Sequence, residues 1–179
     1  MEVKKLYENG PALLFPKVFK DDRGYFYETF NENDFKEKVG DINFVQDNES
    51  MSSYGTIRGM HFQKGEHAQA KLVRCTKGKI YDVAVDIRPN SKTFGQYVKV
   101  ELSEENKKML YIPKGFAHGF VALSDVEIVY KTLGEYNADA DSGIIWNDAT
   151  INIDWEIDFN PILSEKDKVR PTLKEFFKL

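Results

Sequence analysis

The stretch that decides the fold is KIYDVAVDIRP, residues 79–89, because two kinds of side chain alternate along it. The odd positions are mostly large and apolar, and they are Tyr81, Val83, Val85 and Ile87. The even positions are small or acidic, and they are Asp82, Ala84 and Asp86. Successive residues of a β-strand point to opposite faces, so this period of two predicts a strand with two distinct faces.

Further strands are predicted on the C-terminal side of this stretch. QYVKVEL at 96–102 alternates in the same way, and MLYIPKGFAHGFVAL at 109–123 and VEIVYKTL at 126–133 are two more strand-like stretches. Turn residues separate them, since TKGK at 76–79 predicts a hairpin turn and PKG at 113–115 predicts another turn. Many short antiparallel strands indicate a sandwich or a small barrel, and such barrels can hold one ligand inside.

Only two helices are expected. In NENDFKEKVG at 31–40, Phe35 and Val39 are four residues apart on one helical face, and Gly40 can end the helix. The second helix is expected near the C-terminus.

Length and composition favour one globular domain spanning residues 1–179. Acidic and basic residues are interleaved around a net charge of −4, so neither a nucleic-acid surface nor an acidic tail is expected. No apolar run has the length of a signal peptide core or a membrane span, so no membrane partner is expected. The single cysteine, Cys75, cannot form an internal disulfide, which fits a soluble protein of the reducing cytoplasm.

Two of the three histidines, His61 and His67, lie in RGMHFQKGEHAQAKLVRC at 58–75. A histidine pair beside a strand-like run raises three hypotheses: a metal site, a catalytic base, or ordinary sheet residues. The residues around the pair decide between them.

Several blocks of sequence, in order, resemble the dTDP-4-dehydrorhamnose 3,5-epimerase family. They run from about Phe15 to Asp167, and they are GxHxQ at 59–63, QAKLVRCTKGKIYDVAVDIRPNSKTFG at 69–95, YIPKGFAHGF at 111–120, Tyr130, SGIIWND at 142–148 and LSEKD at 163–167. The resemblance implies an all-β double-stranded β-helix (a cupin jelly-roll barrel) with a few short helices. It also implies a homodimer, a nucleotide-sugar substrate, no cofactor, and a role in dTDP-L-rhamnose biosynthesis.

The residues present differ from the ligand set of metal-binding cupins, which argues against the metal hypothesis. Metal-binding cupins use a His-x-His pair, a glutamate a few residues later, and a histidine after a Pro-x-Gly turn. His118 is kept here, but Gln63 replaces the second histidine of the pair, and Gln69 and Lys71 occupy the region of the acidic ligand. An amide is a poor ligand and an ammonium cannot be one, so no metal is expected.

Epimerase chemistry explains these residues better. The C–H bonds at C3 and C5 of a 4-keto sugar are acidic because both flank the carbonyl, and inversion removes a proton from one face and returns one to the other. The resemblance implies that His61 is the base, a role that suits histidine as a residue type, because a free imidazole titrates with a pKa of about 6.5. His61 has the strand parity of Gln63, and its alternative role is that of an ordinary sheet histidine.

The resemblance assigns three more catalytic roles. Asp167 is the partner that orients the histidine, although Ser164 and Asp167 could also be a capping box at a helix start. Tyr130 is the acid, and its alternative is a buried tyrosine that only fills the core. Lys71 stabilises the enolate at the C4 oxygen, and its alternative is a solvated sheet lysine.

The substrate-binding residues also come from the resemblance, and they are Arg23, Phe26, Glu28, Gln46, Asn48, Arg58, His118, Tyr136, Asp141 and Lys166. Arginine suits a diphosphate because its planar fork forms bidentate bonds, and Phe26 with Tyr27 could stack on thymine. Arg58 has the strand parity opposite to His61, and a bulge or kink at Gly59 is expected to bring the two to one face. Asp141 stands where the family commonly has glutamate, which puts that contact in doubt.

Three alternative functions remain open at this point. One is a monoepimerase acting at a single carbon, and another is a cupin that moves the keto group between C3 and C4 with histidine and tyrosine on one face. The third is a non-catalytic sugar-binding module, since a fold does not fix a function. Such a module has no need of His61, Lys71, Tyr130 and Asp167 together.

Overall fold

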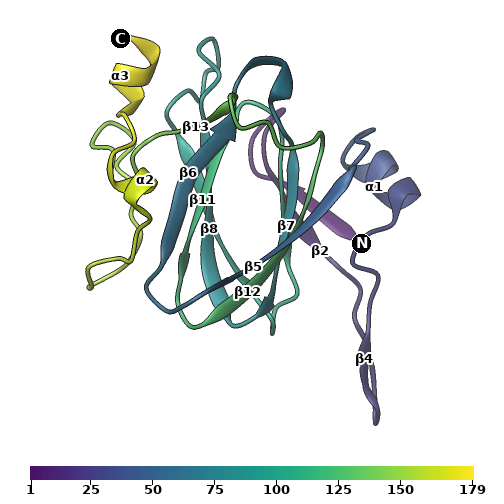
Figure 1. Ribbon diagram of the computed structural model, residues 1–179. Helices are drawn as coiled ribbons and strands as arrows, with labels where there is room; N and C mark the ends of the chain where they lie inside the picture. Colours follow the sequence, from purple (N-terminus) through teal and green to yellow (C-terminus); the bar gives the residue numbers. More distant parts are fainter.

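Two antiparallel sheets pack face to face in a computed structural model that describes residues 1–179 (Figure 1). The six-stranded sheet has the order β1 (Glu2–Lys5), β2 (Ala12–Phe15), β10 (Met109–Ile112), β7 (Lys71–Lys77), β12 (Val126–Thr132) and β5 (Gln46–Ser52). The five-stranded sheet has the order β13 (Asp141–Gly143), β6 (Ile57–Gln63), β11 (Phe116–Ala122), β8 (Lys79–Asp86) and β9 (Tyr97–Ser103). The predicted all-β jelly roll is therefore confirmed.

Strand β8 lies inside the five-stranded sheet, between β11 and β9, and both of its faces are buried. Val83 and Val85 pack outward in a cluster with Trp155 from the C-terminal segment. Ala84 faces inward, into the cluster that fills the space between the two sheets. The alternation of the sequence thus separates an outer apolar layer from the barrel interior.

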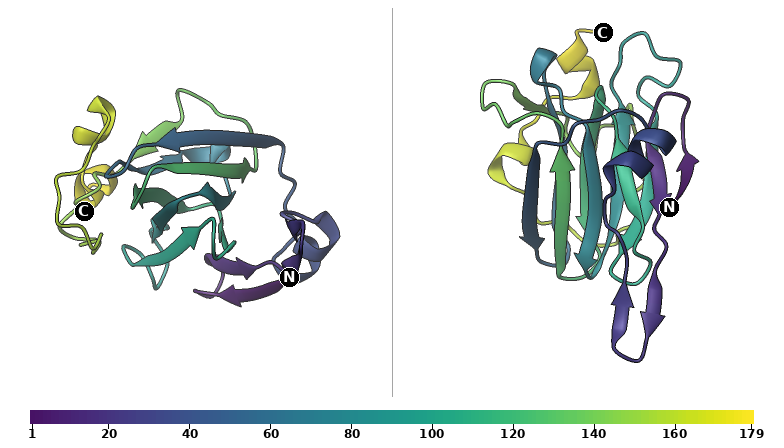
Figure 2. Two further views of the ribbon diagram at one scale, coloured as in Figure 1. Left: turned by 90° about the horizontal axis from the view of Figure 1, so that it is seen from below. Right: turned by 90° about the vertical axis from the view of Figure 1, so that its right-hand side faces the viewer.

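Helices cover the outer faces of the two sheets on opposite sides of the molecule (Figures 1 and 2). On the six-stranded sheet, α1 (Glu32–Lys38) buries Phe35 in a cluster with Leu14 and Tyr111. The predicted helix is confirmed, with Asn31 as its N-cap and Gly40 just past its end. No helix is long and apolar enough to cross a membrane.

The expectation of a single further helix is wrong, because the C-terminal region forms two, α2 (Glu165–Lys168) and α3 (Leu173–Phe177). A short 3₁₀ turn also spans Gly65–His67. Each of these segments is too short to show an apolar helical period in the sequence.

Two predicted strand connections differ in the structure. Residues 109–123 form two strands, β10 and β11, which lie in different sheets on either side of the turn at 113–115. The turn at 76–79 is not a hairpin, since β7 and β8 also belong to different sheets. Val73 of β7 and Ile80 of β8 both enter the central core, so the chain crosses from one sheet to the other at Gly78.

A separate two-stranded hairpin, β3 (Phe19–Asp21) and β4 (Gly24–Phe26), projects from the body of the molecule (Figure 2). Its aromatic side chains are exposed, Phe19 at 53%, Tyr25 at 59% and Phe26 at 66%.

Candidate active site

A cavity of about 410 Å³ opens between the two sheets and receives side chains from both. From the five-stranded sheet come His61, Gln63 and Asp141. From the six-stranded sheet come Gln46, Asn48, Lys71, Tyr130 and Thr132. The remaining lining residues are Phe62, which is also on β6 of the five-stranded sheet, and Gln69 and Tyr136, which lie outside the strands. Most of these groups are polar, so the cavity suits a hydroxylated ligand rather than an apolar one.

His61 forms a dyad with Asp167, since its Nε2 lies 2.6 Å from the Asp167 Oδ1. The Asp167 side chain is almost fully buried, whereas the His61 ring is about one-third exposed toward the cavity. Burial alone raises the pKa of Asp167, but the hydrogen bond and charge of His61 hold it below its usual value. A carboxylate in this position fixes the imidazole and stabilises its protonated form, which is what a general base requires.

Asp167 takes part in a helix cap and also contacts His61, through its backbone and its side chain respectively. Its backbone amide donates to the Ser164 side chain, 3.1 Å away, which caps α2. Its carboxylate points instead to His61. The short helix therefore presents the carboxylate to His61.

Tyr130 lies on β12, opposite Asn48 of β5 and Val73 of β7. It packs against the central core and lines the cavity. Burial raises the pKa of Tyr130 above its ordinary value, although the charge of Arg58 opposes this. The phenol therefore keeps its proton at neutral pH and can donate it.

Lys71 also faces the cavity, and its Nζ lies 5.9 Å from the centre of the Tyr130 ring. Burial lowers the pKa of the Lys71 ammonium to about 8, while the negative charges of Asp82 and Asp141 oppose this. A cation placed next to Tyr130 on the six-stranded sheet can stabilise an oxyanion in the cavity.

The expected irregularity at Gly59 is present. His61 pairs with His118 of β11 and Arg58 pairs with Phe120, so β6 uses one residue more than β11 over this span. Gly59 has a φ of +140°, and a Cβ there would lie 2.5 Å from the Cα of Gly119. The bulge cancels the opposite parity of Arg58 and His61. The Arg58 guanidinium does not line the cavity; it donates to the Ser52 hydroxyl at 2.8 Å and to the Met51 carbonyl at 2.9 Å.

Asp141 lines the cavity and is held by two cations. It forms ion pairs with Lys166 and with Arg170, the latter at 3.1 Å. Burial raises the pKa of Asp141, but these two partners bring it below its usual value. Asp141, at the position where the family commonly has glutamate, is thus part of an ion-pair cluster. Its ion pair with Lys166 places that lysine beside the cavity.

The other predicted binding residues fall into three groups. Gln46, Asn48 and Tyr136 line the cavity. His118 lies deeper, is buried, and pairs with Asp82 at 2.6 Å. Arg23, Phe26 and Glu28 belong to the projecting hairpin and the segment after it, and none of them lines the cavity of the same chain. Arg23 is paired instead with Asp21 in the hairpin, and its side chain is 91% exposed.

Two charged residues near the site were not predicted as functional from the sequence. Asp82 was placed on the even face of its strand, but nothing local indicated that it meets His118. Arg170 lies beyond the LSEKD block and contacts Asp141 and, at 3.8 Å, Asp167. Both contacts join segments that only the fold brings together.

The donor set does not fit a transition metal. His61 is engaged by Asp167 and His118 by Asp82, while the two remaining cupin ligand positions hold an amide and an ammonium. No group of three or more His, Cys, Asp or Glu side chains is placed to hold a metal ion.

Metal independence is a testable prediction of this donor set. We expect the epimerase activity that the resemblance implies to survive exhaustive treatment of the purified protein with EDTA, because the residues present offer no transition-metal site. The readout is the initial rate before and after chelation, with added Mg²⁺, Mn²⁺ or Zn²⁺ as the comparison. Complete loss that a single one of these ions restores is the opposite result.

Comparisons with known proteins agree with one another. The family model described as dTDP-4-dehydrorhamnose 3,5-epimerase matches residues 7–175. The dTDP-4-dehydrorhamnose 3,5-epimerase of Escherichia coli is 56% identical over 169 residues, which cover 93% of this chain and 91% of that protein.

Two solved structures extend the likeness to three dimensions. The crystal structure of dTDP-4-dehydrorhamnose 3,5-epimerase from Elizabethkingia anophelis superposes with a TM-score of 0.92 at 49% identity, covering 98% of this chain and 97% of the other. The dTDP-6-deoxy-D-glucose-3,5-epimerase of Legionella pneumophila, in complex with dTDP-4-keto-L-rhamnose, gives a TM-score of 0.93 at 40% identity, with coverages of 97% and 93%.

Proposed function

The chain belongs to the dTDP-4-dehydrorhamnose 3,5-epimerase family, and we infer that it converts dTDP-4-dehydro-6-deoxy-D-glucose into dTDP-4-dehydro-L-rhamnose by inverting C3 and C5. The enzyme is an isomerase that acts on a nucleotide sugar. In the relative from Legionella pneumophila, dTDP-4-keto-L-rhamnose is the molecule bound.

One observation carries the residue assignments: the base and the acid stand on opposite sheets of the barrel. His61 enters the cavity from β6 of the five-stranded sheet, and Tyr130 enters it from β12 of the six-stranded sheet. A sugar ring held between the sheets meets one group on each face, which is what inversion at carbon requires. A shift of the keto group with both groups on one face fits this arrangement less well.

The proposed steps move one proton at a time. His61 removes the proton from C3 or C5, and the electron pair of the C–H bond moves to the C4 oxygen to form an enolate. Lys71 stabilises the negative charge on that oxygen, and Asp167 stabilises the imidazolium. Tyr130 then delivers its proton to the opposite face of the same carbon. Before the second carbon is inverted, water takes the proton from the His61 imidazolium and returns one to the Tyr130 phenolate, so both groups regain their starting states.

A second copy of the chain is proposed to complete the binding site for the nucleotide part of the substrate. Arg23, Phe26 and Glu28 match the family positions but lie on or next to the projecting hairpin, whose aromatic side chains are left exposed. An exposed apolar hairpin marks a surface that another protein covers. We propose that in a homodimer the hairpin carries these residues to the cavity of the partner.

The apolar and aromatic stretch PALLFPKVF, residues 11–19, suggests from its sequence a segment that pairs or packs across a partner. Pairing is not available to residues Ala12–Phe15, because they form β2, which pairs with β1 and β10 of the same chain. The hairpin that follows it is the segment available to a partner.

A shared site makes a specific prediction. Sedimentation at micromolar concentration should give about twice the chain mass of 20.7 kDa. His61→Asn and the double variant Arg23→Ala/Phe26→Ala should each be nearly inactive alone. After the two are mixed and exchanged, activity should return, because a mixed dimer contains one cavity with both intact parts. A monomer with full activity, or a mixture that stays inactive, contradicts the shared site.

A cytoplasmic location remains a proposal. It is supported by the single cysteine, Cys75, which is buried. Burial raises the pKa of the Cys75 thiol to about 11, so it is a core residue without the reactive thiolate of a redox site.

The direct test of the function is product analysis. The purified protein is incubated with dTDP-4-dehydro-6-deoxy-D-glucose, the 4-keto group is then reduced chemically, and the sugars are identified by NMR. L-configured 6-deoxysugars inverted at both carbons support the proposal. Products inverted at C3 alone identify a monoepimerase, and an unchanged sugar that binds without reacting identifies a binding module.

A further inference from the structure

Asp82 is a buried carboxylate with one unsatisfied oxygen. It lies on the interior face of β8 and is fully buried. Its Oδ1 is 2.6 Å from the His118 Nε2, whereas its Oδ2 has no hydrogen-bond partner. An unpaired carboxylate oxygen in a protein interior is costly unless a positive charge lies nearby.

Lys71, on β7 of the facing sheet, is the cation on which the Asp82 charge acts, across the barrel interior and without a direct ion pair. Among the carboxylates near Lys71, Asp82 acts most strongly on its ammonium, ahead of Asp141. The other titratable groups that face this region are His61, His118 and Tyr130. Burial lowers the pKa of His118, although Asp82 opposes this, so His118 adds little positive charge near neutral pH.

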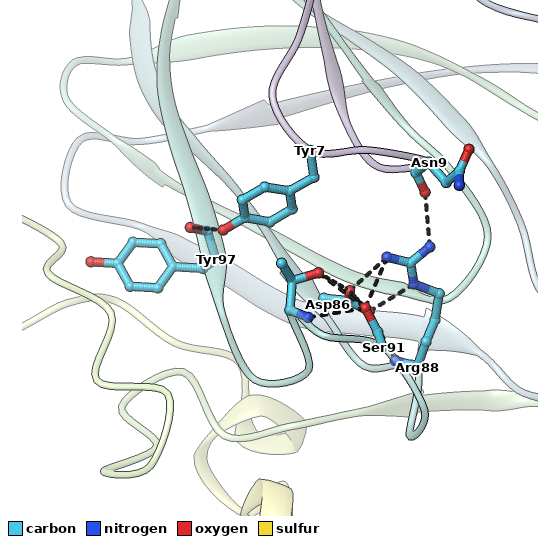
Figure 3. A network of polar contacts seen from close by, with 7 residues as sticks. Tyr7, Asn9, Asp86, Arg88, Ser91 and Tyr97 are labelled. Atoms are coloured by element: carbon cyan, nitrogen blue, oxygen red, sulfur yellow. Dashed lines mark hydrogen bonds and ion pairs between the residues drawn. The ribbon is translucent and has the colours of Figure 1, made fainter.

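Asp86 shows what a purely structural carboxylate on the same strand looks like. It is also fully buried, four residues further along β8 on the same face. Its oxygens are saturated by Arg88 at 2.6 and 2.8 Å, by Ser91 at 2.5 Å and by Thr93 at 2.6 Å (Figure 3). This network fixes the loop between β8 and β9, and Asp86 does not line the cavity. Asp82 has no such set of partners.

We propose that Asp82 is a positioning residue for the reaction: one carboxylate oxygen holds His118, and its buried, otherwise unpaired charge stabilises the Lys71 ammonium across the barrel interior. This inference rests on the proposed function, because the charge on Lys71 matters only if an enolate forms in the cavity. It assigns a role to a residue that does not touch the substrate and lies outside the predicted set of catalytic residues.

The proposal predicts in which direction the pH dependence of kcat/KM changes when Asp82 is replaced. Lys71 is charged below its pKa of about 8, so kcat/KM falls as the pH rises through that value. Asp82→Asn removes one of the negative charges that oppose the effect of burial on Lys71. The pKa of Lys71 therefore drops further in this variant. The fall of kcat/KM on the alkaline side of its pH profile, called the basic limb below, should therefore move to lower pH by about one unit or more.

The experiment measures kcat/KM for deuterium exchange into dTDP-4-dehydro-6-deoxy-D-glucose between pH 6 and 10. Wild type, Asp82→Asn and Asp86→Asn are compared. Asp86→Asn removes an equally buried charge from the same strand, so it controls for lost stability. We expect it to lower the melting temperature while the basic limb stays where wild type has it.

His118→Gln separates charge from structure. It breaks the Asp82–His118 contact but keeps the Asp82 charge, so its basic limb should stay near that of wild type or move to higher pH. If the pair serves only to hold the barrel together, Asp82→Asn and His118→Gln lower the rate alike and neither moves the limb, which overturns the proposal.

Folding of each variant is checked by circular dichroism. If Asp82→Asn does not fold, Asp82→Ser removes the same charge with a smaller side chain and is expected to shift the limb in the same direction. A wild-type protein without exchange refutes the proposed function itself. An active wild type with an unmoved limb in the folded Asp82 variant refutes only the role of Asp82.

Discussion

Replacing His61 with asparagine is expected to reduce deuterium exchange into the substrate by about 10²- to 10⁴-fold, the usual cost of removing a general base. His61 is the only histidine that both lines the cavity and contacts a buried carboxylate, Asp167. Asparagine is the preferred replacement because its amide can still donate to Asp167, which is only 3% exposed. The fold is therefore retained, and the loss reports on chemistry.

His67→Asn is the matched control. His67 lies six residues away, its side chain is 42% exposed, and it is not part of the cavity. Its replacement should leave exchange at the wild-type rate. Near-normal exchange in a folded His61→Asn protein, by contrast, removes His61 from the mechanism.

The second large effect is expected in Tyr130→Phe, where proton removal and inversion should separate. The ring still packs against the core, while the donor on the six-stranded sheet is lost. His61 can still form the enolate, and it returns a proton from the face it came from. Deuterium should therefore continue to enter with retained configuration, while net inversion falls by about 10²- to 10⁴-fold.

The measurement compares the rate of deuterium entry with the rate of product formation in one NMR time course. Tyr111→Phe is the control, because Tyr111 is a buried tyrosine in the cluster beneath α1, outside the cavity. Removing such a hydroxyl costs about 0.5–1.5 kcal/mol of stability at most and should change neither rate. If both rates also stay near wild type in Tyr130→Phe, the proton comes from elsewhere, and Tyr136 becomes the next candidate.

The sequence predicted the elements whose signal is local. The alternation in residues 79–89 gave the two faces of β8, and the Phe35–Val39 spacing gave α1. The parity conflict between Arg58 and His61 even located the bulge at Gly59, because a one-residue shift reverses the side-chain direction.

What the sequence could not predict depends on contacts between distant segments. The turn at 76–79 has the residues of a hairpin, but the strands that flank it belong to different sheets because both bury side chains in one central core. The Asp82–His118 and Arg170–Asp141 contacts join residues 36 and 29 positions apart, and no local period encodes them.

The sequence also could not place the hairpin residues relative to the cavity, because that placement depends on the folded structure. The resemblance named Arg23, Phe26 and Glu28 as substrate contacts, yet a family motif does not say which copy of the chain contributes them. The position of β3 and β4, projecting from the barrel, supports the proposal that a partner copy receives these residues.

The most direct test of the central claim is proton NMR of dTDP-4-dehydro-6-deoxy-D-glucose incubated with the wild-type protein in deuterated water. If His61 and Tyr130 act from opposite sheets on both carbons that flank the ketone, the signals of the C3 and C5 protons should both disappear as deuterium replaces them, and the product should be inverted at both carbons. Loss of the C3 signal alone, or no loss at either carbon, contradicts the account.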